Sequence, residues 1–359
     1  MSHLDRNSMY FRRSAVCLAL MLGLVSGCKG EGADPSSNPI GSDVSRVSPS
    51  ATQAFRITSS DDLIGGPAAQ GRVGDFMLRN AYVRAVIQQP GYSAGAGPHG
   101  GNLIDADLVR PSEEPGRDSF GEVSVFFNLD LSMDVDTVSV LDAGSSGTAR
   151  IQACGRDGVF DFIDLGSLLG DGAFVSWLIP YDWHTLVGVD ICTTYSLGLE
   201  DHFVRIATTI TNTSSDDLDM PIGDLIDIGG DVENFLPNPE GGTYGRGEDE
   251  DEYGGFGEAV FAPLDFLGLF GDGVSYGYVT PLLNGDVNAL QVSTSGVTVT
   301  VLGTTKVVPL LRGRDVVLTS IPEGESVTLE RQFVIGKTLG DVTDEIHRIR
   351  GQATGIVQG

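Results

Sequence analysis

Two groups of carboxylates are the residues in this sequence best suited to chemistry. Asp105 and Asp107 are two residues apart, so on a β-strand both side chains would project from one face. They directly follow the glycine-rich segment 95–101, which contains His99. The second group consists of Asp224, Asp227, Asp231 and Glu233. Facing carboxylates can act as general acid and base on a glycosidic bond or can bind a metal ion, whereas the alternative is that they accept hydrogen bonds from loop backbone. The candidate catalytic residues are Asp105, Asp107, Asp227 and Asp231.

A cluster of aromatic residues around Pro180 could hold a ligand. A sugar ring stacks on exposed aromatic faces, although aromatic side chains also fill protein cores. The candidate ligand-binding residues are Trp177, Tyr181, Trp183, His184 and His99.

Two stretches resemble cofactor motifs but depart from them. Residues 95–100 match the dinucleotide fingerprint in letters, yet Pro98 and the following Gly101 forbid the helix that must bind the phosphates. The acidic run 248–252 offers oxygens of the kind that Ca²⁺ prefers, but Val260 stands where an EF-hand needs its bidentate glutamate. We therefore expect no cofactor, and Ca²⁺ bound at the acidic run remains the alternative to a solvated loop.

The N-terminus has the pattern of an export signal. Three arginines precede an apolar run, Ala15–Val25, which is about eleven residues long and is too short for a membrane span of about 20. The following Val25-Ser26-Gly27-Cys28 resembles the lipobox of bacterial lipoproteins, which implies cleavage after residue 27 and acylation of Cys28. Lys29 after that cysteine, by resemblance to lipoprotein sorting, favours the outer membrane of a Gram-negative bacterium. Residues 28–53 are rich in Ser, Pro and Gly, which predicts a disordered tether.

The cysteine count predicts a disulfide, and the net charge limits the classes of partner. Of four cysteines, Cys17 leaves with the signal and Cys28 is acylated, so Cys154 and Cys192 remain as an even pair. In an oxidising compartment such a pair predicts a disulfide, and two buried thiols are the alternative. The net charge of −27 excludes nucleic acid as a partner, because so acidic a surface repels phosphates.

From residue 54 to residue 350 the sequence predicts strands almost throughout. Val204, Ile206, Thr208 and Ile210 alternate with polar or small residues, and Val327, Leu329, Phe333 and Ile335 share one face after a type I turn at residues 321–324. Only residues 341–350 look helical, with Asp341 as the cap, and residues 351–359 form a tail. The pattern is typical of a large antiparallel β-sandwich with one short C-terminal helix.

Several stretches between about residues 70 and 340 resemble a known architecture. They are "GDFMLRNAYVRAVIQQPG", "GGNLIDADLVRP", "GRDSFGEVSVFFNLDL", "GRDGVFDFIDL", "VRIATTITNTSSDDLDMPIGDLIDIGGDVENF" and "IPEGESVTLERQFVIG". They resemble the N-terminal all-β region of secreted bacterial proteins whose longer members end in a metallohydrolase domain of the polymerase-and-histidinol-phosphatase type. The pattern is also similar to the β-supersandwich of galactose mutarotase-like proteins, which include sugar epimerases.

The catalytic residues of those relatives are not found in this sequence. In aldose epimerases the strand after the asparagine turn carries a histidine, but residues 223–227 read Gly-Asp-Leu-Ile-Asp here. The metallohydrolase domain requires a His-x-His pair, and His99, His184, His202 and His347 are far apart in sequence. We therefore expect a lipid-anchored, non-catalytic envelope module that binds a carbohydrate or another envelope polymer. The alternatives are a carbohydrate-active enzyme (lyase, hydrolase or epimerase-like) that uses the clustered carboxylates, or a truncated relative of the metallohydrolases.

Overall fold

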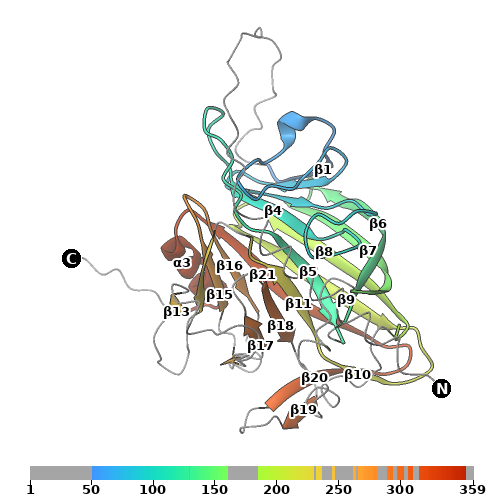
Figure 1. The fold of residues 1–359 in the computed structure, drawn as a ribbon. Helices are drawn as coiled ribbons and strands as arrows, with labels where there is room; N and C mark the ends of the chain where they lie inside the picture. The colour runs from blue at the N-terminus through green and yellow to red at the C-terminus, as the bar shows by residue number, and fades with distance from the viewer. Residues whose placement is uncertain are drawn as a thin grey trace, which may run out of the picture. The chain divides into compact units, whose positions relative to one another are not determined.

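In the described part of the chain, about half of the residues form β-strands, and these strands pair antiparallel (Figure 1). A computed structural model describes residues 51–128, 130–160, 185–229, 232–236, 245–246, 262–263, 266–280, 289–293, 297–302, 306–309 and 315–352. All of them belong to one compact unit, Val47–Gly359. In the described part, no helix has the length and apolar character needed to cross a bilayer.

Hydrogen-bonded pairing divides most strands into two sheets. The first sheet runs in the order β1 (Gln53–Arg56), β2 (Phe76–Arg79), β3 (Val83–Ile87), β4 (Leu103–Leu108), β5 (Glu122–Phe127), β11 (Ile222–Asp227), β18 (Val297–Leu302), β17 (Ala289–Ser293) and β14 (Ala262–Pro263). The second runs in the order β6 (Leu131–Ala143), β7 (Thr148–Val159), β8 (Val189–Gly198), β9 (Phe203–Asn212), β21 (Ser326–Gly336), β16 (Ser275–Val279), β15 (Phe266–Phe270), β12 (Glu233–Leu236) and β13 (Gly245–Arg246).

The two sheets are joined at one corner and pack face to face. Between β5 and β6 the chain turns from Phe127 to its partner Leu131, and Asn128 adopts a left-handed φ of 49° in this turn, a conformation that asparagine tolerates. Apolar side chains from both sheets form one continuous core, to which β5 contributes Val123 and β9 contributes Ile206. The structure is therefore a β-sandwich.

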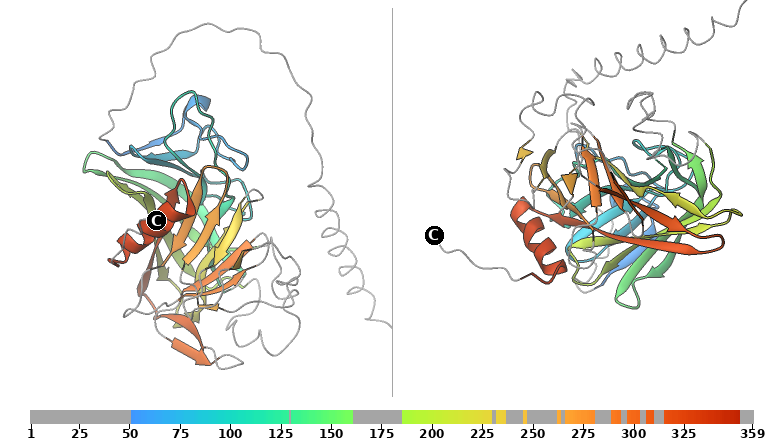
Figure 2. Two further views of the ribbon diagram at one scale, coloured as in Figure 1. Left: turned by 90° about the vertical axis from the view of Figure 1, so that its left-hand side faces the viewer. Right: turned by 90° about the horizontal axis from the view of Figure 1, so that it is seen from below.

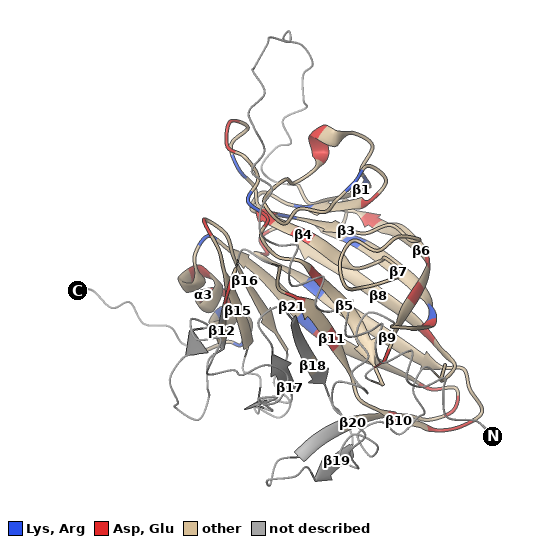
Figure 3. Cartoon of the chain, in the orientation of Figure 1, with Lys and Arg blue, Asp and Glu red and all other residues tan. Residues whose placement is uncertain are grey.

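Smaller elements complete the fold. A separate sheet consists of β10 (Leu218–Met220), β20 (Asp315–Ile321) and β19 (Lys306–Pro309), and a 3-10 helix η1 covers Ser60–Asp62. The helix α3 (Leu339–Ile349) packs on β15, β16 and β21 (Figure 2). Acidic positions lie on loops, on η1 and along strands such as β6 (Figure 3).

The structure confirms the predicted all-β, antiparallel sandwich with one C-terminal helix. It also confirms the predicted core faces, because Ile206 and Ile210 of β9 and Leu329 and Phe333 of β21 are buried in the shared core.

Two local predictions were wrong in detail. Asp341 is not the helix cap: Thr338 is the N-cap and Asp341 is the third helical residue. The Asp341 carboxylate accepts a hydrogen bond from the Thr338 backbone and so completes a capping box.

The turn predicted at residues 321–324 begins one residue later, at Pro322. The Glu325 N–H donates to the Pro322 carbonyl, because Gly324 adopts a left-handed φ of 74° inside the turn.

Candidate functional site

Two carboxylates lie opposite each other on the outer face of the first sheet, the face turned away from the core. Glu122 begins β5 and Asp227 ends β11, and the register of these two strands pairs them directly. Their neighbours Val123 and Ile226 point into the core, so alternation along each strand directs both carboxylates outward. Glu122 is completely buried, whereas Asp227 is only partly buried.

The glycine-rich segment 95–101 covers Glu122. The Gly97 N–H donates to Oε2 of Glu122 at 2.8 Å, and the Asn102 amide donates to Oε1 at 2.5 Å. A Cβ atom added at Gly97 would lie 2.4 Å from Oε1, and one added at Gly95 would lie 2.7 Å from Oε2 and 3.5 Å from the Asp227 carboxylate. Only glycine allows the loop backbone to lie this close to the two carboxylates. Gly95 and Gly97 therefore let the loop pack directly on the Glu122–Asp227 pair.

The surroundings of this pair raise the pKa of both carboxyl groups. The pKa of Glu122 rises to about 7: burial is the main cause and the charge of Asp227 adds to the rise, while the hydrogen bonds from Gly97 and Asn102 oppose it. Burial also raises the pKa of Asp227, against the hydrogen bond that the Gly229 N–H donates to it. The Glu122 carboxyl can therefore take up and release a proton near pH 7.

His99 lies at the end of the same glycine-rich segment, beside strands of the second sheet. Its Nδ1 atom is 3.4 Å from the Asp134 carboxylate of β6, and its Nε2 atom is 3.3 Å from the Val159 carbonyl of β7. The imidazole is partly exposed, and Asp134 is mostly exposed. His99 of this segment and Asp134 of β6 therefore lie together at the surface beside the end of β7.

Asp105 and Asp107 lie on β4 and share its outer face, as predicted, but each holds a loop in place. Asp105 accepts hydrogen bonds from the backbone N–H groups of residues 70 and 71, the shorter of them at 2.7 Å, and burial raises its pKa to about 6. Asp107 binds the Arg110 guanidinium through both oxygens and also accepts from the Arg117 N–H. Both carboxylates thus fasten loops to β4, which is the alternative that the sequence left open.

The structure separates the described members of the second predicted carboxylate group: Asp224 and Asp227 lie on opposite faces of β11, and Glu233 lies on β12 of the second sheet. Asp224 points into the core, where it accepts hydrogen bonds at 2.5 Å from Nε and Nη2 of the fully buried Arg331 on β21, and another at 2.6 Å from the Tyr278 hydroxyl. Burial alone would lower the pKa of Arg331, but the Asp224 carboxylate raises it above its ordinary value. Asp224 therefore links the two sheets, while Asp227 faces outward.

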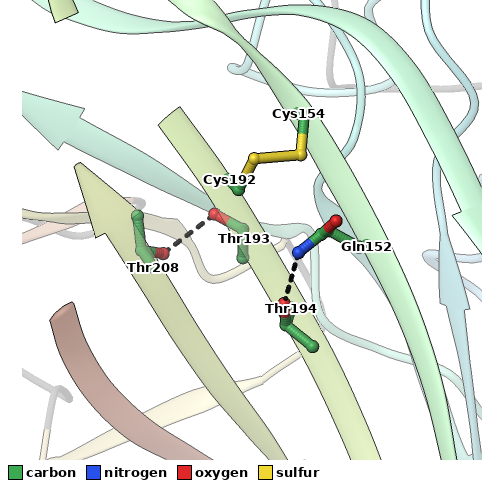
Figure 4. The surroundings of a disulfide bond; sticks show 6 residues. All are labelled: Gln152, Cys154, Cys192, Thr193, Thr194 and Thr208. Carbon is green, nitrogen blue, oxygen red and sulfur yellow. Dashed lines mark hydrogen bonds between the residues drawn. A yellow bond between two sulfur atoms is a disulfide. The ribbon is translucent and has the colours of Figure 1, made fainter. Parts of the chain in front are cut away.

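The predicted disulfide is confirmed. Cys154 of β7 and Cys192 of β8 are directly paired across the strands, with their Cα atoms 4.2 Å apart (Figure 4). Neighbouring polar side chains also link the strands, since the Gln152 amide donates to the Thr194 hydroxyl at 3.1 Å.

The remaining predicted residues lie outside the part of the chain that the structure describes. They are Cys28, Trp177, Tyr181, Trp183, His184, Asp231 and the acidic run 248–252. Among the described residues, no group of three or more His, Cys, Asp or Glu side chains is placed to hold a metal ion.

Sequence reasoning missed Glu122, which is the partner of the predicted Asp227. A signal was present, because a single glutamate begins the otherwise apolar or small run Glu122-Val-Ser-Val-Phe-Phe. A charge at the start of a strand that is buried along its whole length must find hydrogen-bond partners.

No protein-family model matches this sequence, and no curated protein matches it significantly. The fold does resemble solved structures. A galactose mutarotase-like protein from Lactobacillus casei ATCC 334 is 12% identical at a TM-score of 0.41, over 73% of this chain and 100% of that protein. A galactose mutarotase related enzyme from Lactobacillus acidophilus is 9% identical at a TM-score of 0.39, over 74% of this chain and 98% of that enzyme.

A larger protein shows a similar likeness. The GH36 alpha-galactosidase AgaB from Geobacillus stearothermophilus is 12% identical at a TM-score of 0.41, and the match covers 80% of this chain and 43% of that enzyme. At these identities and TM-scores, the likeness concerns the arrangement of strands and says nothing about activity. The relation to metallohydrolases stays a prediction.

Proposed function

We propose that this chain is a lipid-anchored protein of the bacterial cell envelope, in the outer membrane, whose sandwich binds a carbohydrate or another envelope polymer without catalysing its conversion. The ligand would contact Asp227 on the outer face of the first sheet and His99 in the glycine-rich segment, beside the second sheet. Hydroxyl groups of a sugar would donate to the partly exposed Asp227 carboxylate and exchange hydrogen bonds with the imidazole.

One observation carries the binding part of this proposal. Glu122, which would have to act as acid or base, is completely buried, and its oxygens already accept hydrogen bonds from Gly97 and Asn102. The carboxylates of Asp105 and Asp107 likewise already accept hydrogen bonds from loop residues. Of these carboxylates Asp227 alone keeps partial exposure, which suits recognition better than proton transfer.

The envelope location is supported by the Cys154–Cys192 disulfide and by the lipobox pattern that ends at Cys28. Disulfides of this kind persist in oxidising compartments and are rare in the cytosol. Labelling with radioactive palmitate in a bacterial host tests the anchor. We expect label on the parent chain and none on Cys28→Ala, and a parent chain without label would refute the anchoring.

Binding of the mature, detergent-solubilised protein to a glycan array, followed by calorimetry on any hit, tests the ligand class. We expect Asp227→Asn to weaken the affinity about tenfold or more, because it replaces a charged acceptor by a neutral one. Asp190→Asn, which alters an exposed carboxylate on the second sheet, is the matched control and should leave the affinity unchanged. The carbohydrate part fails if the parent chain binds no glycan or envelope polymer.

A carbohydrate-active enzyme is the second candidate, and the Glu122–Asp227 pair favours it. Directly opposed residues of antiparallel strands have Cβ atoms about 4.5–5.5 Å apart, and retaining glycosidases hold their carboxyl groups about 5–5.5 Å apart. The raised pKa of Glu122 suits a general acid. If the protein releases reducing sugar from a polysaccharide, Glu122→Gln should lower that rate about 100-fold or more. Retention of the rate would exclude this pair as the catalytic one.

A further inference from the structure

One end of the sandwich concentrates exposed apolar side chains. The described part of the chain has six large apolar residues with high exposure, and four of them lie at this end. They are Tyr82 (40% exposed), Val109 (45%), Leu141 (53%) and Leu199 (36%), and we call this set the entry surface. Single exposed apolar residues are ordinary, but a cluster of them commonly marks a contact surface.

Hydrogen bonds hold the turns of the entry surface together. The Val109 N–H at the end of β4 donates to the Tyr82 carbonyl in the β2–β3 turn at 2.7 Å. The Asn80 amide of the same turn donates to the carbonyls of Gly198 and Asp201 in the β8–β9 turn, which contains Leu199. The Tyr82 ring also packs against the His202 ring at a tilt, with ring centroids 4.5 Å apart.

The chain enters the sandwich at this same end. Gln53, the first residue of β1, pairs with Arg79 immediately before the β2–β3 turn. The hydroxyl of the preceding Thr52 contacts the Gly144 carbonyl of the β6–β7 turn, three residues beyond Leu141. The residues that connect the sandwich to Cys28 therefore leave it beside the entry surface.

We propose that the entry surface docks on the lipid bilayer to which Cys28 is anchored. This inference depends on the proposed anchoring. The tether predicted for residues 29–53 has 25 residues, and a Ser/Gly-rich coil of that length has a root-mean-square reach of about 28 Å. Such a tether would keep the entry surface within reach of the headgroups and its effective concentration there high.

The chemistry of the entry surface fits the bilayer interface. Tyrosine is enriched at membrane interfaces, where its ring lies among apolar groups and its hydroxyl reaches water. Acidic residues such as Asp142 and Glu200 lie among the apolar ones, so lipid charge does not drive the contact. We therefore expect docking on zwitterionic phosphatidylcholine vesicles, with little dependence on salt.

Quenching by brominated lipids tests this contact on the full lipidated chain in phosphatidylcholine vesicles. One variant carries Tyr82→Trp, and its matched control carries Leu186→Trp, which replaces an exposed apolar residue (56%) outside the entry surface. The parent chain supplies the background from Trp177 and Trp183. We expect the emission added at position 82 to fall by roughly half and the emission added at position 186 to change little. Adding Leu199→Asp to the first variant should restore its emission.

Each outcome separates the two proposals. If the lipidated chain fails to float with the vesicles, the anchoring itself fails. If it floats but the emission at positions 82 and 186 responds equally, docking by the entry surface is refuted while the anchoring stands. A third outcome is that emission at position 82 falls equally with brominated and unbrominated lipids and changes with the protein-to-lipid ratio. This result would show a contact between two copies of the chain and would also refute the proposal.

Discussion

The buried Glu122 carboxyl should make stability depend on pH in a way that one substitution removes. Its pKa rises from the ordinary 4.5 to about 7 in the folded chain, chiefly because it is buried. The folded state therefore holds this proton more tightly than the unfolded state does. At about 1.36 kcal/mol for each pH unit, the difference corresponds to about 3 kcal/mol. This contribution to stability is complete below the unfolded pKa and is lost as the pH rises to about 7.

Glu122→Gln removes the ionisation and keeps the shape of the side chain. The free energy of unfolding of the variant minus that of the parent should therefore increase by about 3 kcal/mol between pH 4.5 and about 7, and then level off. Taking this difference cancels the titration of the other carboxyls and any constant cost of the new amide facing Gly97 and Asn102. Urea unfolding at a series of pH values measures it.

Two results would contradict this reasoning. A difference that does not change with pH would mean that Glu122 titrates alike in both states. A difference that falls with rising pH would mean that the hydrogen bonds from Gly97 and Asn102 outweigh burial and stabilise the ionised form. A second variant, Asp227→Asn, removes the charge beside Glu122 and should lower the pKa of Glu122.

Three further predictions concern the disulfide, the buried ion pair and the glycine-rich segment. Replacing both Cys154 and Cys192 by serine opens a loop with a sequence separation of 38 residues and should lower the free energy of unfolding by about 4 kcal/mol in urea; a loss near zero would contradict the chain-entropy estimate. Arg331→Met leaves the buried Asp224 carboxylate unpaired and should cost about 3–5 kcal/mol, measured in the same way. Gly97→Ala should displace the loop, expose the carboxylate beneath it and return that pKa toward 4.5, which carbon-13 NMR of labelled glutamate can follow.

The Arg331 prediction has a matched control on the neighbouring strand. Arg205 lies on the exposed face of β9, so Arg205→Met removes the same charge without leaving a buried partner. We expect its effect to stay within about 0.5 kcal/mol. Equal losses for both variants would show that the buried ion pair is not the cause.

The strands could be predicted from the sequence because each one carries its own alternation, but their order could not. In β9 and β21 the residues that face the core recur at every second position, which is a local pattern. The pairing of β5 with β11 joins segments about a hundred residues apart, and no local pattern records it. Because that pairing places Glu122 beside Asp227, the site could be predicted only in part.

Backbone donors explain why the sequence could not decide between a catalytic and a structural role for Asp105 and Asp107. The spacing of Asp105 and Asp107 correctly placed both on one face of a strand, but the N–H groups that occupy them belong to residues 70, 71 and 117. Main-chain N–H groups are the same at almost every position, so residue types cannot reveal which carboxylate they will occupy.

The alternation of side chains along a strand, which placed Asp105 and Asp107 on one face, could also have separated Asp224 from Asp227. Asp224 and Asp227 are three residues apart, so on one strand they must project from opposite faces. The apolar Ile222 and Ile226 share the alternation of Asp224, which places that carboxylate in the core, where it needs a cation such as Arg331. Asp227 shares the alternation of Gly223 and Leu225 and faces outward. The same short segment therefore supplies an internal link between the sheets and, at its end, the partly exposed member of the Glu122–Asp227 pair.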